Sequence, residues 1–170
     1  IYNLLNSLKF NLSETKKLDG YISTNYKVID KDGKQFVVKH YKDASELALI
    51  KEEIDFVDIV KKEVPFQLSE TLNVDGKKIH FLPDGSFARF LPFIKGQFLA
   101  ESDQTPTLLF NFGVSAAQLD LGLKSIVAPN ISSRILEWDI QHTCVNLDKI
   151  EYIADEGKRN LALYFMDQFE

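Results

Sequence analysis

The sequence of 170 residues predicts an α+β fold, in which an antiparallel sheet with one long helix is followed by a helical region. Three runs rich in β-branched and aromatic residues lie between residues 15 and 41, and Asp32-Gly33, between the second and third runs, suits a tight hairpin. An amphipathic segment at 44–62 then interrupts the strand pattern. Helical periodicity returns after Gly96.

The two helices expected in the first half have clear local signals. The opening ten residues carry three leucines at helical spacing, Leu4, Leu5 and Leu8. We therefore expect a short helix at the start of the chain. The helix at 44–62 ends where Lys61 and Lys62 suit the negative end of the helix dipole, and Pro65 prevents its continuation.

The strand pattern resumes after the long helix. The segments SETLNV and KKIHFL are expected to form hairpin arms, because Asp75-Gly76 joins them. The turn Pro83-Asp84-Gly85 then leads into the apolar segment SFARFLPFI. We therefore expect a five-stranded antiparallel sheet by residue 95, with the long helix inserted after the third strand.

The remaining chain is expected to be helical. Thr105 and Pro106 form a cap and a first-turn proline, and residues 147–169 also have helical character. The first of these helices carries a stripe with the spacing of a buried face: Leu109, Phe112, Ala116, Leu119 and Leu123. The second carries another stripe: Ala162, Phe165, Met166 and Phe169. Because the second stripe reaches the end of the chain, we expect it to be uncovered and to mediate self-association.

Charge and composition exclude several classes of function. The formal net charge is −5 and the basic residues are scattered, so we do not expect nucleic-acid binding. No segment approaches the roughly 18 unbroken apolar residues of a membrane helix, so we expect no membrane contact. Cys144 is the sole cysteine, which fits a reducing compartment, and we expect a cytoplasmic protein. The chain begins at Ile1 rather than Met, so we expect the natural N-terminus to lie elsewhere.

A lysine and a glutamate are the first candidate functional residues. Alternation places Lys39 on the face of its strand opposite Val38; a solvent-exposed lysine is the ordinary alternative to one that holds phosphates in a cleft. At about 100° per residue, Glu53 falls in the middle of the apolar arc of the long helix, and Glu52 lies toward its edge. A carboxylate on a buried face is costly unless it is paired. We therefore expect an ion pair between Lys39 and Glu53, with an accommodated edge glutamate as the alternative.

The connector between the two halves is a second candidate feature. The segment FARFLPFIKG is apolar and ends in glycine, and Pro92 removes one ladder donor from it. Backbone groups left unpaired at such a junction can hydrogen-bond the edge of an adenine. An ordinary edge strand that contains a proline is the alternative.

The order of these features resembles the N-lobe of the aminoglycoside phosphotransferase and choline kinase superfamily. LDGYISTNYKV resembles its first hairpin and phosphate-side loop, FVVKHY its lysine strand, and EEIDFVDIVKKEVP its helix and following turn. FLPFIKG resembles its connector and FGVSAAQLDLGL the first helix of its C-lobe, while LEWDI and ADEGKRNLALYFMDQFE resemble the hydroxylysine-kinase-like branch. The resemblance implies a protein-kinase-like, nucleotide-binding N-lobe at 1–95 and the connector and first helices of a partial C-lobe at 96–170.

The resemblance also implies a role for several residues. Lys39 would contact the α- and β-phosphates of a nucleotide, and Glu53 would orient Lys39. Ser23 and Asn25 would lie in the loop over the phosphates. Positioning and charge neutralisation of this kind supply most of the catalysis in phosphoryl transfer.

The connector and the cofactor follow from the same resemblance. The carbonyl of Pro92 and the amide of Ile94 would pair with adenine. The implied cofactors are ATP and Mg²⁺, with the metal ligands in a part of the protein beyond this chain. The implied reaction is phosphorylation of a hydroxyl on a small, amine-bearing metabolite.

The catalytic signature of the family is not found in the sequence. The family uses a His-x-Asp loop with Asn five residues after the Asp, followed by a metal-binding aspartate, and no His-x-Asp occurs here. Asp155 and Asn160 have the required separation, but Ile153 stands at the histidine position. We therefore expect no catalytic or metal-binding residue in this fragment and no activity from it alone. The alternative is a non-catalytic kinase-like binding or interaction module, which could belong to a larger multidomain protein.

Overall fold

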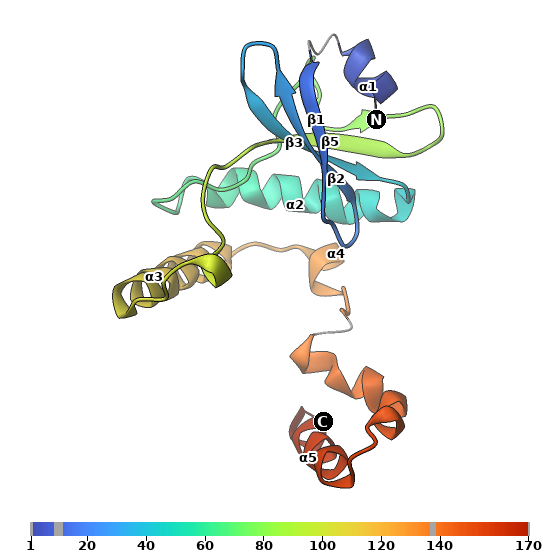
Figure 1. Cartoon of the computed structure of the whole chain (residues 1–170), viewed down its shortest axis with the longest axis vertical. Coiled ribbons are helices and arrows are strands. Elements are labelled where there is room, and N and C mark those ends of the chain that lie inside the picture. The colour runs from blue at the N-terminus through green and yellow to red at the C-terminus, as the bar shows by residue number, and fades with distance from the viewer. Residues whose placement is uncertain (1, 9–11, 137–138, 170) are drawn as a thin grey trace. The chain divides into compact units, whose positions relative to one another are not determined.

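The computed structural model describes residues 2–8, 12–136 and 139–169. The chain divides into two compact units, residues 1–128 and 129–170, which are described separately. The predicted α+β architecture is confirmed in the first unit (Figure 1). The boundary between the two compact units, after residue 128, differs from the lobe boundary expected near residue 96. The division into a nucleotide-binding lobe at 1–95 and a partial C-lobe at 96–170 stays a prediction.

Within the described residues, five strands form one antiparallel sheet in the order β1-β2-β3-β5-β4. Their bounds are Leu12–Leu18 for β1, Thr24–Asp30 for β2, Gln35–Tyr41 for β3, His80–Phe81 for β4 and Phe87–Pro92 for β5. Gly33, with φ 78°, makes the turn between β2 and β3 and donates its amide to the carbonyl of Asp30. The Asp32-Gly33 hairpin predicted from the sequence is therefore confirmed.

The second predicted hairpin is only partly formed. Val74 and Lys77 make an isolated bridge around the turn, and the segment SETLNV is not a strand. In KKIHFL, only the two residues of β4 pair with β5. The amide of Leu72 nevertheless donates to the carbonyl of Phe90 over 2.8 Å, so the segment still covers the outer edge of β5 at one point.

The helices of the first unit start and stop close to their sequence signals. They are α1 at Tyr2–Ser7, α2 at Leu47–Val60 and α3 at Pro106–Leu123, with short 3₁₀ helices at Ala44–Glu46 and Leu99–Glu101. The side chain of Asp43 caps the turn before α2 by accepting from the amide of Ser45 over 2.8 Å. Among the helices of the described residues, none is long and apolar enough to cross a membrane.

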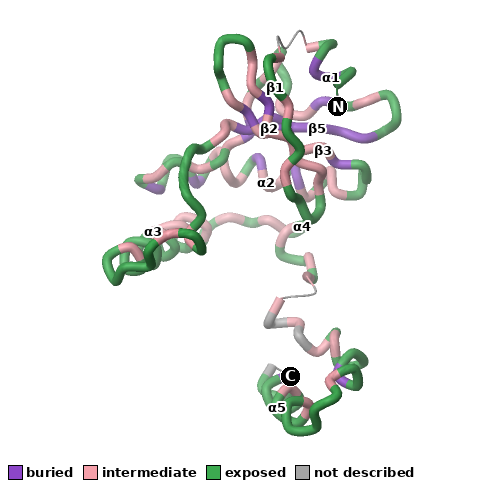
Figure 2. The backbone as a smooth tube through the Cα atoms, viewed as in Figure 1, coloured by how far each residue is buried: buried purple, intermediate pink, exposed green. Residues whose placement is uncertain are grey.

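The sheet carries a hydrophobic cluster on each face. On one face, Leu4 and Leu5 of α1 pack with Val28, Val38 and Phe90. On the other, a second cluster joins α2 to the sheet: Tyr41, Ile50, Ile54 and Phe87. Buried positions are concentrated in β5 (Figure 2), whose residues contribute to both clusters. The face under α2 is the one that carries Lys39, because side chains alternate along β3.

Helix α3 begins as predicted but does not bury its stripe. The Thr105 hydroxyl accepts from the amide of Leu108 over 3.2 Å, and Pro106 follows the cap. No described residue of α3 is buried, and Leu109 and Phe112 are 44% and 59% exposed. The predicted burial of this face is therefore wrong within this chain, because only the end of the helix packs closely. There, a Cβ built on Gly122 would lie 3.2 Å from Val60 of α2.

The second unit contains α4 at Pro129–Ser132, a 3₁₀ stretch at Ile140–Tyr152, α5 at Glu156–Met166 and a 3₁₀ turn at Asp167–Phe169. The predicted helix at 147–169 is thus interrupted, because Asp155 caps α5 by accepting from the amide of Lys158 over 2.9 Å. Of the predicted stripe, Met166 is buried while Phe165 is 55% exposed. The side chain of Phe169 and part of the segment LEWDI lie outside the described residues.

His80 should make the stability of the first unit depend on pH. Its ring is buried against Phe90, and its Nε2 has no hydrogen-bond partner among the described residues. Burial lowers the pKa of His80 below its usual 6.5, so below that pH the unfolded chain binds the proton more readily than the folded chain does. The free energy of unfolding should therefore decrease as the pH falls below 6.5.

Urea unfolding from about pH 7.5 to about pH 5 measures this effect. His80→Leu should flatten the dependence on pH, whereas His40→Asn should leave the contribution of His80 in place. Burial also lowers the pKa of His40, so the two variants separate the two contributions. An unchanged pH dependence in His80→Leu would show that this ring does not titrate with folding.

Candidate functional site

Three polar residues form a row across the middle of the sheet. The register pairs Asn25 of β2 with Lys39 of β3, and pairs Lys39 with Arg89 of β5. Cross-strand partners share one face of a sheet. The row therefore lies on the face that α2 covers.

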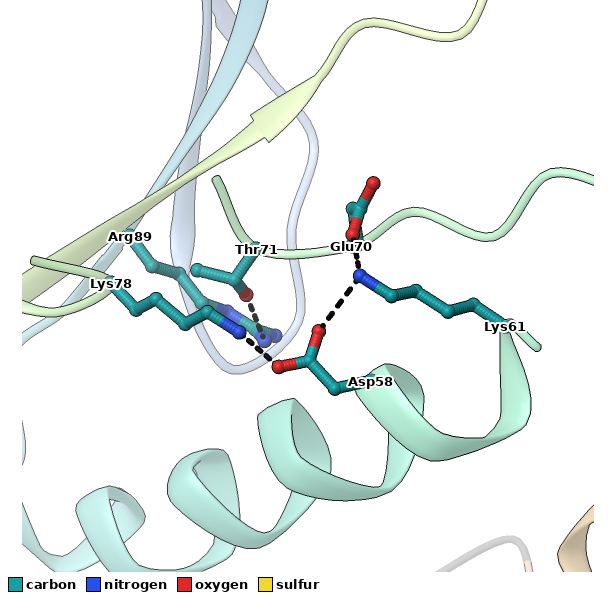
Figure 3. Close-up of polar contacts among 6 residues, drawn as sticks. All are labelled: Asp58, Lys61, Glu70, Thr71, Lys78 and Arg89. Atoms are coloured by element: carbon teal, nitrogen blue, oxygen red, sulfur yellow. Dashed lines mark hydrogen bonds and ion pairs between the residues drawn. The ribbon is translucent and has the colours of Figure 1, made fainter. Parts of the chain in front are cut away.

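Arg89 is the most buried member of this row, with a side chain that is 2% exposed. Its Nη2 donates to Oε1 of Glu53 over 2.7 Å, its Nε to the Tyr41 hydroxyl over 3.1 Å, and its Nη1 to the Thr71 hydroxyl over 3.3 Å. Figure 3 shows the contact with Thr71. A buried charge is tolerated when it is paired and its donors are used, and Arg89 meets both conditions.

The predicted ion pair between Lys39 and Glu53 is wrong as a direct contact. Glu53 does lie on the sheet-facing side of α2, as its helical position predicted, but its carboxylate binds Arg89. The two cations are neighbours on adjacent strands, and the more deeply buried one has the greater need of the carboxylate. Lys39 is half-buried, so its ammonium can retain part of its hydration.

The surroundings of Lys39 favour its neutral form more than water does. Burial is the main cause that lowers the pKa of Lys39, and repulsion from Arg89 lowers it further. The charge of Glu53 acts in the opposite direction. Glu53 therefore influences Lys39 electrostatically although it does not pair with it.

The loop between β1 and β2 is held closed by side chains next to it. Nδ2 of Asn25 donates to the carbonyl of Asp19 over 2.9 Å, and the Ser23 hydroxyl donates to Oδ1 of Asn25 over 2.8 Å. Ser23 lies in the loop as expected, whereas Asn25 is in β2 and supports the loop from the sheet. A β-carbon at Gly20 would lie 2.2 Å from the carbonyl of Ser23, so the loop closes this tightly only with glycine there.

A pocket of about 260 Å³ lies beside this loop. Residues 20–24 of the loop line one part of it, and residues 40–43 at the end of β3, together with Glu46, line the rest. Lys42, Asp43 and Glu46 bring charges of both signs to its wall. The pocket therefore suits a polar occupant, with loop backbone on one side.

The connector presents its backbone along the outer edge of β5. The amide of Phe93 donates to the carbonyl of Gln35, so this residue faces β3, whereas the carbonyl of Phe90 faces outward to Leu72. Because orientation alternates, Pro92 also faces outward, and its missing N–H removes no bond to β3. Ile94, two residues further along, is 49% exposed.

A group of ion pairs fastens the end of α2 to the segment before β4 (Figure 3). Asp58 of α2 binds Lys78 and Lys61, and Lys61 also binds Glu70. Exposed pairs of this kind each contribute about 0–1 kcal/mol. These ion pairs matter because they hold the segment that carries Thr71, one of the hydrogen-bond partners of Arg89.

The described residues contain no group of three His, Cys, Asp or Glu side chains that could hold a metal ion. Asp155, which had the spacing of a catalytic aspartate relative to Asn160, acts as a helix cap. The cation of the polar row, the hydroxyl of the loop and the backbone edge of the connector are groups that could hold phosphates and a planar base. Arg89, Tyr41 and Thr71 were not selected from the sequence, although an arginine within the apolar run FARFLPFI was a signal that a buried charge needs a partner.

No family model matches the sequence, and no curated protein matches it. Solved structures do match. One is an amicoumacin kinase, hAmiN, in complex with AMP-PNP, Ca²⁺ and Ami, with a TM-score of 0.64 and 14% identity over 92% of this chain. Another is the spectinomycin phosphotransferase APH(9)-Ia in complex with ADP and its antibiotic, with a TM-score of 0.59 and 13% identity over 96% of this chain. The aminoglycoside phosphotransferase APH(4)-Ia has a TM-score of 0.50 and 16% identity over 73% of this chain.

These matches establish the fold. The chain has the fold of the corresponding part of aminoglycoside-phosphotransferase-like kinases, with the five-stranded sheet and helices expected from the sequence. It spans 48% of the length of the amicoumacin kinase, 52% of APH(9)-Ia and 38% of APH(4)-Ia.

Gly20→Ala should open the loop between β1 and β2. The new methyl group would meet the backbone carbonyl of Ser23 and the side-chain Nδ2 of Asn25, and the backbone carbonyl cannot move aside as cheaply as the end of a side chain. We expect a loss of about 1–3 kcal/mol in the free energy of unfolding, as for other overpacked sites. Gly96→Ala is the matched control, because a Cβ there has nothing within 4 Å. Equal stability of the two variants in urea would contradict the tight closure.

Proposed function

We propose that this chain is the ATP-binding part of a phosphotransferase that phosphorylates a hydroxyl group of a small, amine-bearing metabolite. The observation that carries the proposal is the row of Asn25, Lys39 and Arg89 beneath α2, in a chain with the fold of nucleotide-using kinases. A lysine on the third strand under a carboxylate-bearing helix is suited to hold phosphate oxygens by charge.

The phosphate groups would lie between Lys39 and the loop that ends at Ser23. Lys39 would contact the α- and β-phosphates, and the Ser23 hydroxyl and the loop backbone would contribute donors. Asn25 supports the loop through its bond to the Asp19 carbonyl. Mg²⁺ would neutralise phosphate charge when bound, and we propose that its ligands lie outside the described residues of this chain.

The adenine would lie against the connector. The carbonyl of Pro92 would accept from the exocyclic amine, and the amide of Ile94 would donate to a ring nitrogen. Both groups follow Phe90 at two-residue intervals, and the carbonyl of Phe90 already points to the same outer edge of β5. This spacing supports recognition of a planar base by one edge of backbone.

The proposed substrate class rests on the fold. The neighbouring proteins are named for amicoumacin, aminoglycosides and spectinomycin, and we propose a small hydroxylated amine for the protein to which this chain belongs. Because the sequence has no His-x-Asp, we propose that the residues that transfer the phosphate lie elsewhere. The chain alone would then be inactive, and the whole protein would act in the cytoplasm.

A non-catalytic interaction module is the second candidate function. The exposed apolar side chains of α3 favour it: Leu109, Phe110, Phe112 and Leu121. Phe165 of α5 is also exposed and could contribute to self-association. A kinase-like unit that binds a partner through these helices would need no phosphate transfer.

Calorimetry with ATP and Mg²⁺ tests the nucleotide-binding proposal. We expect weak binding without turnover, because the metal ligands would be absent from the chain. Lys39→Met should lower the affinity by about tenfold or more, since it removes the cation proposed to contact the phosphates. Lys51→Met, at an exposed position of α2, is the matched control and should bind like the wild type. Tight binding of ATP that Lys39→Met leaves unchanged, or any phosphate transfer by the chain, would contradict the proposal.

A further inference from the structure

Arg89 is held more firmly than Lys39, the other charged side chain of the polar row. It is fully buried, and its three nitrogens donate to partners on three different segments: β3, α2 and the residues before β4. Moving it would leave a buried charge without partners, which is strongly destabilising. The guanidinium therefore has a fixed position, and the carboxylate of Glu53 must lie within hydrogen-bonding distance of it.

We propose that Arg89 is the positioning residue of this site, which holds Glu53, and with it α2, over the sheet face that carries Lys39. The proposal rests on the proposed function for the role of Lys39 in holding phosphates. In place of a direct lysine–glutamate pair, the carboxylate binds the arginine on the strand next to Lys39.

Two charged side chains of the described residues, Arg89 and Glu53, act on the pKa of Lys39. Arg89 faces it from β5 and Glu53 from α2, while its neighbour on β2 is the uncharged Asn25. Tyr41, two residues along β3, binds Arg89, and burial raises the pKa of its hydroxyl. Lys39 therefore lies beside one fixed cation, and the carboxylate that this cation holds acts on it from α2.

This arrangement has a consequence for ligand binding. Because Glu53 pairs with Arg89, the half-buried ammonium of Lys39 has no carboxylate partner among the described residues. An anionic group that reaches Lys39 would supply the missing negative charge. The site is therefore prepared for phosphate without any movement of Glu53 away from Arg89.

NMR titration of Lys39, followed through ¹³C-labelled lysine Cε signals and assigned with Lys39→Arg, tests the arrangement directly. Arg89→Gln should raise the pKa of Lys39, because it removes the repulsion, and Glu53→Gln should lower it, because it removes the attraction. A merely structural role for the pair would loosen the site in both variants, admit water and raise the pKa in both. Arg89→Lys keeps the charge and should restore most of the wild-type titration.

Shifts in opposite directions support the proposal, and shifts in the same direction, or none, overturn it. If Arg89→Gln does not fold, Glu53→Gln decides alone: a lowered pKa supports the proposal, and an unchanged or raised pKa overturns it. Thr71→Val is the matched control, since it removes one hydrogen bond of Arg89 but no charge. It should leave the titration of Lys39 close to that of the wild type.

Calorimetry with AMP-PNP separates this inference from the proposed function. Glu53→Gln and Arg89→Gln should each weaken AMP-PNP binding, and the double variant should bind no more weakly than the weaker single variant, because both act through one contact. Additive losses overturn the inference while the nucleotide-binding proposal stands. Opposite pKa shifts in a chain that does not bind AMP-PNP would support the arrangement and overturn the proposed function.

Discussion

The ion pair between Arg89 and Glu53 is the interaction on which the arrangement of this site depends. A guanidinium in the middle of a sheet is costly to bury, and it is tolerated here because each of its nitrogens finds an acceptor. Those acceptors belong to β3, α2 and the segment before β4. The need to satisfy one buried charge thus fixes a helix and a loop segment against the sheet.

The remaining structure supports this central contact. Ile50 and Ile54 pack α2 onto Tyr41 and Phe87, so hydrophobic contacts also hold the helix against the sheet on both sides of Glu53 in the sequence. The ion pairs Asp58–Lys78 and Lys61–Glu70 tie the C-terminal end of α2 to the segment that carries Thr71. Hydrophobic packing is non-directional, whereas the charged contact is directional. Together they specify both the distance of α2 from the sheet and its position along it.

Local signals predicted the parts of the fold that depend on local chemistry. The Asp32-Gly33 turn, the Thr105 cap and the apolar arc of α2 all follow from residues within a few positions of one another. The segment SETLNV has strand-like composition yet forms only a bridge, because pairing depends on partners far away in the sequence. The stripe of α3 has the spacing of a buried face, but none of it is buried and Leu109 and Phe112 are exposed, since spacing does not supply the surface that would cover it.

The candidate site shows the same limit at a finer scale. The helical phase placed Glu53 toward the sheet correctly, but two cations on adjacent strands compete for it, and only the register of β3 and β5 reveals that Arg89 is one of them. Ser23 was placed correctly in its loop, while Asn25 proved to be a strand residue that supports that loop. Nucleotide binding by Lys39, Ser23 and the connector remains a prediction.

We propose that a nucleotide binds between the polar row, the loop and the connector. The most direct measurement is a ¹H–¹⁵N NMR titration of the chain with AMP-PNP and Mg²⁺, read as a map of shifted amides. We expect the largest shifts at Gly20, Ser23, Lys39 and Ile94, with little change in residues 129–170. A map without shifts at these four amides, or one centred on α5, would contradict it.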